Sequence, residues 1–327
     1  MAIHIVRFDL RRPGFVNTPR QELYAAALDM AAYADEHGFS GITLSEHHGT
    51  EDGYLPAPLT LAACMVGRTQ GISISIAALL VPLHEPLELA ETMAVLDVAS
   101  RGRVAVTAGL GYRPEEYAMF DKDWKGRGAL FDECLETMLR AWTGEPFEYR
   151  GRTVRVTPEP FTKPHPALFV GGLSRAAARR AARFGLPFQP SSNSDDLAHI
   201  YQAECAKHGI ENGVILRPGS GEQIFVSEDP DKTWAEIGHH LLHDATVYAG
   251  WQQPGQVSAV HSNATTAEEL RSEGKYRILT PEQCIERGHS QGPRATFVLH
   301  PMCGGIAPER AWESLRLYAT RVLPELN

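Results

Sequence analysis

The chain has 327 residues, of which 43% are hydrophobic and 22% are charged, ordinary values for a soluble globular protein with a sizeable core. Its 31 basic and 40 acidic side chains give a formal net charge of −9, which disfavours nucleic acids and anionic membranes as partners. The five cysteines are widely spaced and form no C-x-x-C pair, so neither a structural zinc site nor a disulfide framework is predicted.

The N-terminus and the apolar runs predict a cytoplasmic location. Residues 1–9 lack the layout of a secretory signal peptide. The longest apolar run, residues 72–83, contains serines and a proline and is too short to span a bilayer. Free thiols fit a reducing cytosol, so we expect a cytoplasmic protein without a membrane segment.

Strands and helices are predicted to alternate along the whole chain. Apolar and β-branched runs predict eight strands, at residues 3–8, 41–44, 72–80, 104–108, 167–170, 186–189, 223–226 and 296–300. Apolar residues at helical spacing predict helices from Thr18 to Gly38 and at residues 58–68, 86–100, 131–142, 175–184, 195–208, 233–247 and 308–323. Because alternating strands and helices form parallel sheets, and eight units can close on themselves, we expect an α/β fold, a (βα)8 barrel formed by residues 1–327 as a single domain.

The first of these helices carries explicit start and stop signals. Thr18 is expected as its N-cap, with Pro19 in the first turn and Gln21 completing a capping box. Gly38 is expected to end the helix, because glycine adopts the left-handed conformation that terminates many helices.

Two stretches do not fit the alternation. Residues 145–166 carry five prolines and predict a short hairpin at residues 147–154 followed by an extended loop. Residues 248–276 are rich in Gln, Ser, Thr and Gly, and a loop of that length in a compact fold is often a lid. We expect a lid here, after the seventh strand.

The most informative motif is Glu46-His47-His48, which follows the short strand at residues 41–44. In a parallel α/β barrel, active sites are built at the carboxyl ends of the strands. Neighbouring residues at a strand end point in opposite directions, so we expect one histidine to face the site and the other to pack against a neighbour. A histidine there can serve as a general base or a hydrogen-bond donor, and the alternative is that both are structural.

Two further strands end in small residues. The third ends near Ala77 and Ala78, which leave room for a flat ligand against the backbone, although alanines can also simply fill a core. The fourth ends at Gly109, whose missing side chain allows close approach of a ligand, and Tyr112 offers an aromatic face and a hydroxyl. This is not a dinucleotide-binding motif, since the third glycine and the acidic partner are absent.

The fifth strand runs into Gly171-Gly172-Leu173-Ser174-Arg175 at the start of a helix. Free N–H groups and the positive end of the helix dipole form a natural anion site, with Ser174 as the expected N-cap. A cofactor phosphate is the expected occupant, and the alternative is an ordinary capped helix after a glycine turn.

Histidines elsewhere suggest no metal site. His239 and His243 are four residues apart on one predicted helix, but no third ligand is evident, so a solvated helix face is the favoured interpretation. The last strand ends at His300, and Gly304-Gly305 follow, where barrels often have a second phosphate-side loop.

Taken together, these motifs resemble the bacterial luciferase-like superfamily of flavin-dependent monooxygenases, which also contains the deazaflavin F420-dependent oxidoreductases. The resemblance covers nearly the whole chain and depends on an ordered set of motifs. These are Glu46-His47-His48, residues 77–82 with His84 and Pro86, residues 96–103, residues 109–112, and residues 171–174 with residues 184–187.

The resemblance implies a TIM barrel that assembles as a homodimer. It implies a non-prolyl cis peptide between Ala77 and Ala78, behind the flavin ring, and places the reactive histidine of luciferase on His47. The family's mobile lid falls on residues 248–276. Two positions depart from the family pattern: Gly109 replaces luciferase's flavin-facing cysteine, and Leu173 replaces an acidic or hydroxylated residue. Phosphate binding would then depend on backbone N–H groups, Ser174 and Arg175.

The function implied is a two-component monooxygenase acting on a small hydrophobic substrate. A partner flavin reductase would deliver reduced FMN, oxygen would form a flavin hydroperoxide, and His47, oriented by Glu46, would move the controlling proton. One alternative is an F420-dependent oxidoreductase that transfers hydride at the same site. Others are a flavin-binding protein without turnover and, more distantly, a metal-dependent barrel hydrolase.

Overall fold

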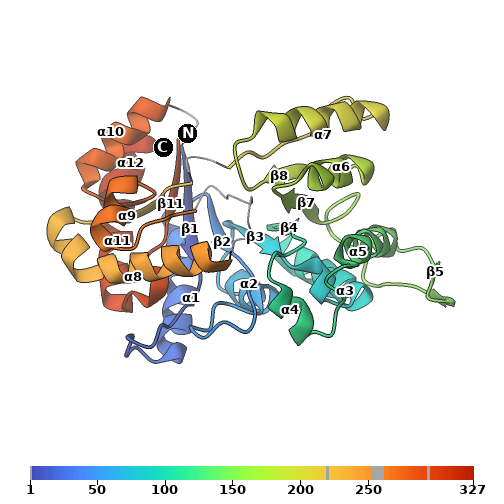
Figure 1. Cartoon of the computed structure of the whole chain (residues 1–327), viewed down its shortest axis with the longest axis horizontal. Coiled ribbons are helices and arrows are strands. Elements are labelled where there is room, and N and C mark those ends of the chain that lie inside the picture. Colours follow the sequence, from blue (N-terminus) through green and yellow to red (C-terminus); the bar gives the residue numbers. More distant parts are fainter. Residues whose placement is uncertain (1, 219–220, 252–260, 293–294) are drawn as a thin grey trace. The chain divides into compact units, whose positions relative to one another are not determined.

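The computed structural model describes residues 2–218, 221–251, 261–292 and 295–327 (Figure 1). The chain divides into two compact units. Unit 1 comprises Met1–Pro56, Gly67–Ser73 and Gly219–Asn327, and unit 2 comprises Ala57–Val66 and Ile74–Pro218. The prediction of a single domain over residues 1–327 stays a prediction.

Among its described residues, unit 1 contains five parallel strands. Their order is β10 (Tyr276–Leu279), β9 (Gln223–Val226), β11 (Thr296–Leu299), β1 (Ile3–Phe8) and β2 (Gly41–Leu44), of which β1, β2 and β11 are labelled in Figure 1. All four residues of β9 are buried, as expected of a parallel strand covered on both faces. The helices of this unit are α1 (Arg20–Glu36), α8 (Pro230–Trp251), α9 (Ala267–Glu273), α10 (Pro281–Gln291), α11 (Pro308–Leu317) and α12 (Leu323–Leu326).

Unit 2 contains four parallel strands, in the order β3 (Ser73–Leu79), β4 (Val104–Ala108), β7 (Ala167–Gly172) and β8 (Phe188–Pro190). The predicted hairpin is confirmed as antiparallel β5 (Phe147–Tyr149) and β6 (Arg152–Val154). The helices are α2 (Pro58–Val66), α3 (Pro86–Ser100), α4 (Pro114–Met119), α5 (Arg127–Ala141), α6 (Arg175–Arg183) and α7 (Asp195–Lys207). The indole of Trp142 donates a hydrogen bond to the carbonyl of Ala90 (3.0 Å), which ties the end of α5 to α3.

All eight predicted strands are confirmed within a residue or two at their ends, and β10 is an additional strand. Parallel pairing inside each unit confirms the α/β class. Closure into a (βα)8 barrel stays a prediction. Among the described residues, no helix is both long enough and apolar enough to cross a bilayer.

The start of α1 differs from the prediction. Pro19 is the N-cap, its backbone is extended, and no side chain caps the helix. The carbonyl of Pro19 accepts hydrogen bonds from Glu22 and Leu23, while the carbonyl of Thr18 accepts one from Arg12 Nε instead. The capping box at Thr18 and Gln21 is therefore wrong, because the helix starts after Pro19. A capping box does occur in α10, where Thr280 and Gln283 bond reciprocally.

The segment expected to be a lid is partly helical. Helix α8 continues through Tyr248 to Trp251, and α9 covers Ala267–Glu273. The prediction of one long loop over residues 248–276 was therefore wrong at both ends, because the first residues continue the amphipathic pattern of α8 and Thr266 caps a separate helix. The central part of the predicted lid, residues 252–260, lies outside the described residues.

Candidate active site

In unit 1, ionisable residues follow the carboxyl ends of three parallel strands. Asp9 follows β1, Glu46 to His48 follow β2, and His300 follows β11. Because these strands are adjacent and parallel, their carboxyl ends lie along one edge of the sheet. All five of these side chains are buried.

Glu46 and His48 form a hydrogen-bonded pair: His48 Nε2 donates to Glu46 Oε1 over 2.8 Å. The imidazole of His47 lies against aromatic rings instead, with ring-centroid distances of 4.6 Å to Trp251 and 4.9 Å to Tyr54. The two histidines thus have different surroundings in unit 1, and the expectation that one of them faces an active site stays a prediction. That Glu46 orients His47 stays a prediction, since the hydrogen bond described for Glu46 joins it to His48.

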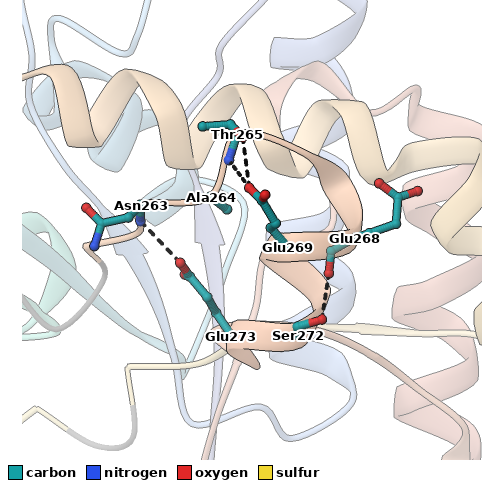
Figure 2. Close-up of a pocket in the computed structure, with 7 residues that line it drawn as sticks. All are labelled: Asn263, Ala264, Thr265, Glu268, Glu269, Ser272 and Glu273. Carbon is teal, nitrogen blue, oxygen red and sulfur yellow. Dashed lines mark hydrogen bonds between the residues drawn. The ribbon is translucent and has the colours of Figure 1, made fainter.

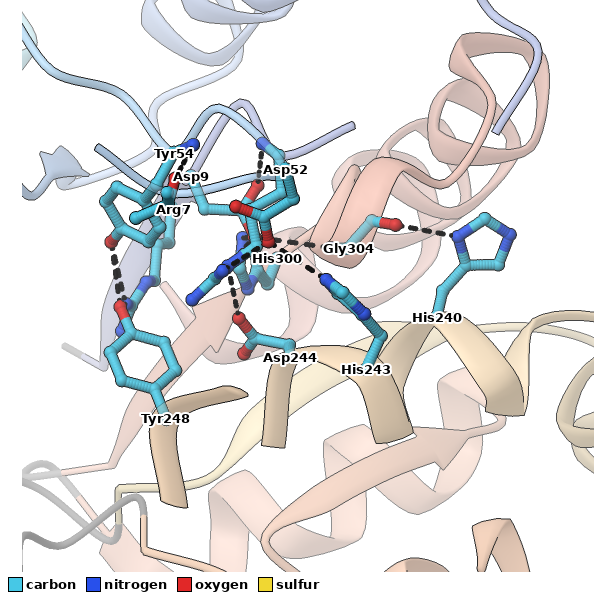
Figure 3. A network of polar contacts seen from close by, with 12 residues as sticks. Arg7, Asp9, Asp52, Tyr54, His240, His243, Asp244, Tyr248, His300 and Gly304 are labelled. Carbon is cyan, nitrogen blue, oxygen red and sulfur yellow. Dashed lines mark hydrogen bonds and ion pairs between the residues drawn. The ribbon is translucent and has the colours of Figure 1, made fainter. Parts of the chain in front are cut away.

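A buried ionic network lies beside these residues and was not predicted. Arg11 is fully buried; its Nη1 donates to Asp52 Oδ2 over 2.5 Å and its Nε lies 3.0 Å from Asp244 Oδ1. His243 Nε2 also donates to Asp52 Oδ2, over 2.9 Å, so this histidine is part of the network and not of a solvated helix face (Figure 3). The guanidinium of Arg11 also lies 4.6 Å from the ring centroid of Tyr54.

The network lowers the pKa of two of its carboxyl groups, those of Asp52 and Asp9. Burial by itself raises the pKa of Asp52, but the hydrogen bond from His243 and the charge of Arg11 outweigh it and hold that pKa well below its ordinary value of 3.8. Burial likewise opposes ionisation of Asp9, and nearby His300 and Arg11 hold its pKa below the ordinary value. Both groups are therefore stabilised as carboxylates in the folded protein.

These shifts predict a loss of stability in acid. Since the pKa of Asp52 is lower in the folded than in the unfolded chain, the unfolded chain binds more protons, and stability falls as the pH drops below about 4. Urea unfolding between about pH 7 and pH 3 should show this decrease, and Asp52→Asn should flatten it. Asp29→Asn, which removes an exposed carboxylate paired with Arg68, is the control. An equally steep decrease in Asp52→Asn and in the wild-type protein would contradict the assignment.

Three buried side chains of unit 1 could also be considered as metal ligands. The potential ligand atoms of Asp9, His300 and Cys303 lie within 4.8 Å of one another. However, Arg11 Nε is 3.7 Å from Asp9 Oδ2, and His300 Nε2 already faces the same oxygen at 3.3 Å. A permanent positive charge so close disfavours a cation, so we assign Asp9 and His300 to the ionic network. Burial raises the pKa of the Cys303 thiol well above its ordinary value, which keeps it neutral.

A surface hollow of unit 1 lies at α9 (Figure 2). Two of its three carboxylates are used within the segment: Glu269 Oε2 accepts from the N–H and hydroxyl of Thr265, each over 2.8 Å, and Glu273 accepts from the N–H of Asn263. These contacts stabilise the start of a short helix, and we assign no ligand to the hollow.

In unit 2, the carboxyl ends of three adjacent strands present almost no side chains. They carry Ala77 and Ala78 on β3, Gly109 after β4, and Gly171 and Gly172 on β7. The peptide bond between Ala77 and Ala78 is cis, as the resemblance implied. We call this set of five residues the cradle.

The cradle glycines lie where no side chain fits. A Cβ on Gly109 would lie 2.7 Å from the Cβ of Ala78, and one on Gly171 would lie 2.8 Å from Thr107 Cγ2. Gly172 has a φ of 146°, which side-chain-bearing residues rarely adopt, and its Cβ would meet Ala177. The backbone is therefore bare and closely packed along this edge, and Tyr112 follows it three residues after Gly109, half-buried.

The predicted phosphate segment begins directly after the cradle. Ser174 is the N-cap of α6, as predicted, and its Oγ accepts from the N–H of Ala177 over 3.2 Å. The first N–H groups of a helix have no partner within the helix and point toward any bound anion. Arg175 lies at the surface, where its guanidinium pairs with Asp196 over 3.2 Å. All eight predicted cofactor residues belong to unit 2, and both predicted catalytic residues, Glu46 and His47, belong to unit 1. That they bind a cofactor and act in catalysis stays a prediction.

Comparison with proteins of known sequence gives a consistent result. The luciferase-like monooxygenase family matches residues 6–290. The alkanal monooxygenase beta chain of Vibrio harveyi is 26% identical over 219 residues, which cover 63% of this chain and 67% of the relative. The uncharacterized protein y4vJ of Sinorhizobium fredii is 28% identical over 164 residues, so the match covers 49% of this chain and only 47% of that relative.

Solved structures show the same fold over the full chain. Monooxygenase RslO1 from Streptomyces bottropensis has a TM-score of 0.78 at 24% identity, and each chain is covered completely. The oxygenating constituent of 3,6-diketocamphane monooxygenase from Pseudomonas putida, in complex with FMN, has a TM-score of 0.71 at 18% identity, with 100% and 99% coverage. An F420-dependent secondary alcohol dehydrogenase has a TM-score of 0.68 at 16% identity and complete coverage of both chains. On the evidence of the family match over residues 6–290, the chain belongs to the luciferase-like monooxygenase family of enzymes.

Proposed function

We propose that the protein is a flavin-dependent monooxygenase that uses reduced FMN and oxygen to oxygenate a small hydrophobic organic substrate. The observation that carries the proposal is the cradle of unit 2, where three neighbouring strand ends carry alanine and glycine in place of larger side chains. A planar ring needs such a surface, and a phosphate group needs the helix start that follows it. The family relationship makes flavin the natural occupant of both.

The residues of unit 2 would hold the cofactor. Ala77 and Ala78 would support the ring with Gly109, and Tyr112 would contact it from the loop after β4. The phosphate would bind the N–H groups of Gly171 and Gly172, with Ser174 and Arg175 beside them. Bound reduced FMN would supply the electrons that activate dioxygen.

The residues of unit 1 would manage the proton. His47 would donate or accept the proton that accompanies oxygen transfer, and Glu46 would help to orient it. The aromatic rings of Tyr54 and Trp251 around His47 would keep bulk water away from it. A closed (βα)8 barrel, a homodimeric assembly, a cytoplasmic location and a separate flavin reductase complete the proposal.

Anaerobic titration with reduced FMN and with reduced F420 tests the choice of cofactor. We expect reduced FMN to bind in the micromolar range or tighter and F420 to bind much more weakly. A medium-chain alkanal is a reasonable assay substrate, because several relatives are alkanal monooxygenases. Oxygen-dependent conversion of the alkanal with reduced FMN would support the proposal.

The second candidate is an F420-dependent oxidoreductase, which the likeness to an F420-dependent secondary alcohol dehydrogenase favours. The same cradle would hold the deazaflavin, and hydride transfer would need no oxygen. If the protein bound F420 tightly but not reduced FMN, and oxidised an alcohol in the absence of oxygen, this candidate would replace the first proposal.

Replacing Ser174 tests the phosphate segment. Ser174→Ala is expected to weaken FMN binding by about tenfold, the usual value for one hydrogen bond to a charged group. Ser194→Ala is a matched control, because Ser194 caps α7 of the same unit in the same way, its Oγ accepting from Leu197 N over 3.3 Å. Both variants lose about 1 kcal/mol of stability from the cap. Equal FMN affinities in the two variants would remove Ser174 from the phosphate site.

Gly109→Ala tests the cradle itself. The new methyl group would lie 2.7 Å from the Cβ of Ala78, so the platform on β3 must shift. We expect FMN affinity to fall at least tenfold, with a stability loss of about 1–3 kcal/mol from overpacking. Gly128→Ala, in the same unit, controls for the loss of a glycine and should keep FMN affinity, because its added Cβ would meet only Arg180 Nη2 at 3.5 Å, an ordinary contact distance. Unchanged affinity in Gly109→Ala would place the ring elsewhere.

A further inference from the structure

Three polar groups form a triangle beside His47 in unit 1. Arg7 Nη2 donates to Tyr248 Oη over 2.7 Å and lies 3.4 Å from Tyr54 Oη. The two hydroxyl oxygens are themselves 2.8 Å apart and share a hydrogen bond (Figure 3). The three residues come from β1, from the loop after β2 and from the last turn of α8, so the fold and not the local sequence brings them together.

Counting protons shows that the triangle cannot use all of its donors. A guanidinium group only donates, so both phenol oxygens accept from Arg7. The two phenols carry two protons, and only one proton can lie between the two oxygens. The second O–H must point out of the triangle, and the hydroxyls of Tyr54 and Tyr248 have no further partner among the described residues. Burial raises the pKa of Tyr248 well above its ordinary value, so this phenol keeps its proton at neutral pH.

The surroundings of this second O–H favour a hydrogen bond from it to a ligand. Tyr54 and Tyr248 are 1% and 7% exposed, and a buried donor without an acceptor is costly. The adjacent cation polarises the phenols and strengthens the hydrogen bond that the free O–H can make. The rings of Tyr54, Tyr248 and Trp251 provide an apolar wall, and the ring centroid of His47 lies 4.9 Å from that of Tyr54 and 6.0 Å from that of Tyr248.

The local charge favours a neutral acceptor. The carboxylates of Asp9, Asp52 and Asp244 all pair with the guanidinium group of Arg11, and the charge of Asp244 also acts on Arg7. A further anion would meet these three carboxylates, whereas a neutral carbonyl oxygen accepts a hydrogen bond without adding a charge.

We propose that Arg7, Tyr54 and Tyr248 form a hydrogen-bond donor site for the carbonyl oxygen of an apolar ligand, next to His47. The assignment rests on the proposed function in that this ligand is the substrate of the flavin reaction. The donor fixes the carbonyl end of the substrate beside His47, and the aromatic rings contact its hydrocarbon part.

The test compares cyclohexanone with cyclohexane, two probes of similar size of which only the first has a carbonyl group. Binding is measured on the full-length protein without cofactor, so a failure of the FMN proposal does not affect it. The variants are Tyr54→Phe, Tyr248→Phe and the double variant, which keep all rings. Tyr276→Phe is the control, since Tyr276 is a buried tyrosine of unit 1 whose hydroxyl donates to Asp244.

The expected pattern is non-additive. Each single variant retains one phenol, and the proton of that phenol no longer lies between two phenol oxygens and can bond to the ligand. The ratio of the variant's affinities for cyclohexanone and cyclohexane should therefore remain within about threefold of the wild-type ratio. The double variant should lose about tenfold or more of that preference, and Tyr276→Phe should keep it. A double variant that still prefers cyclohexanone, or a wild-type protein that shows no preference, overturns the proposal.

A second measurement needs no double variant. In protein labelled with ¹³C at the tyrosine ζ carbon, the single variants assign the resonances of Tyr54 and Tyr248. Cyclohexanone should shift at least one of them, and cyclohexane should shift neither. If cyclohexanone binds and leaves both resonances in place, the ligand does not reach the pair and the assignment is wrong.

Discussion

Replacing His47 by alanine is expected to lower turnover by about 10²- to 10⁴-fold, the usual contribution of a general acid or base. The affinity for reduced FMN is expected to remain within about threefold, because the proposed contacts to the ring and the phosphate all come from unit 2. The measurements are reduced-FMN titration and oxygen-dependent conversion of a medium-chain alkanal.

His48→Gln is the matched control for this variant. His48 is buried like His47 and adjacent to it, and its described hydrogen bond is to Glu46. A glutamine amide can still donate to that carboxylate, so most of the turnover should remain. Turnover equal to wild type in His47→Ala would remove His47 from the mechanism, and a loss of FMN affinity would give it a binding role instead.

Arg11→Met is expected to lower the free energy of unfolding by about 3–5 kcal/mol, the typical result of breaking a buried ion pair from one side. Methionine fills much of the same space, so the loss is electrostatic. Without the guanidinium group, the carboxylates of Asp52 and Asp244 lose a buried cation at 2.5 and 3.0 Å. Urea denaturation at neutral pH measures the change.

Arg68→Met is the control for the removal of an arginine. Arg68 pairs with Asp29 over 2.6 Å, but both side chains are about half exposed, and such pairs contribute at most about 1 kcal/mol. If Arg11→Met cost no more than Arg68→Met, the buried network would not be a stabilising feature of unit 1.

Most of the architecture could be predicted because its signals are local. The β-branched run that forms β3 and the apolar residues at helical spacing in α3 each specify their element within a short window. Strand β10 was missed because Tyr276–Leu279 contains Arg277 and directly follows the polar stretch that was assigned to a loop. The start of α1 was misplaced because a capping pattern at Thr18 competes with the extended backbone that Pro19 adopts.

The cradle could be predicted for a similar reason. Alanines and glycines at the ends of consecutive strands are visible in the sequence, and parallel pairing of β3, β4 and β7 brings them to one edge. Ser174 could be identified as a helix cap from its position alone.

The ionic network and the tyrosine pair could not be predicted from local patterns. Asp52 and His243 are 191 positions apart, and Tyr54 and Tyr248 are 194 positions apart. The signal that the sequence does contain is Arg7 within an apolar strand, followed by Arg11 in a stretch that is buried. A charged side chain at such a position must have a partner, but only the tertiary structure identifies that partner.

The most direct test of the central claim is a crystal structure of the protein with bound FMN. The account predicts the isoalloxazine ring against Ala77, Ala78 and Gly109, with the phosphate at the N–H groups between Gly171 and Ser174. A ring bound away from β3 and β4, or a phosphate bound away from the start of α6, would contradict it.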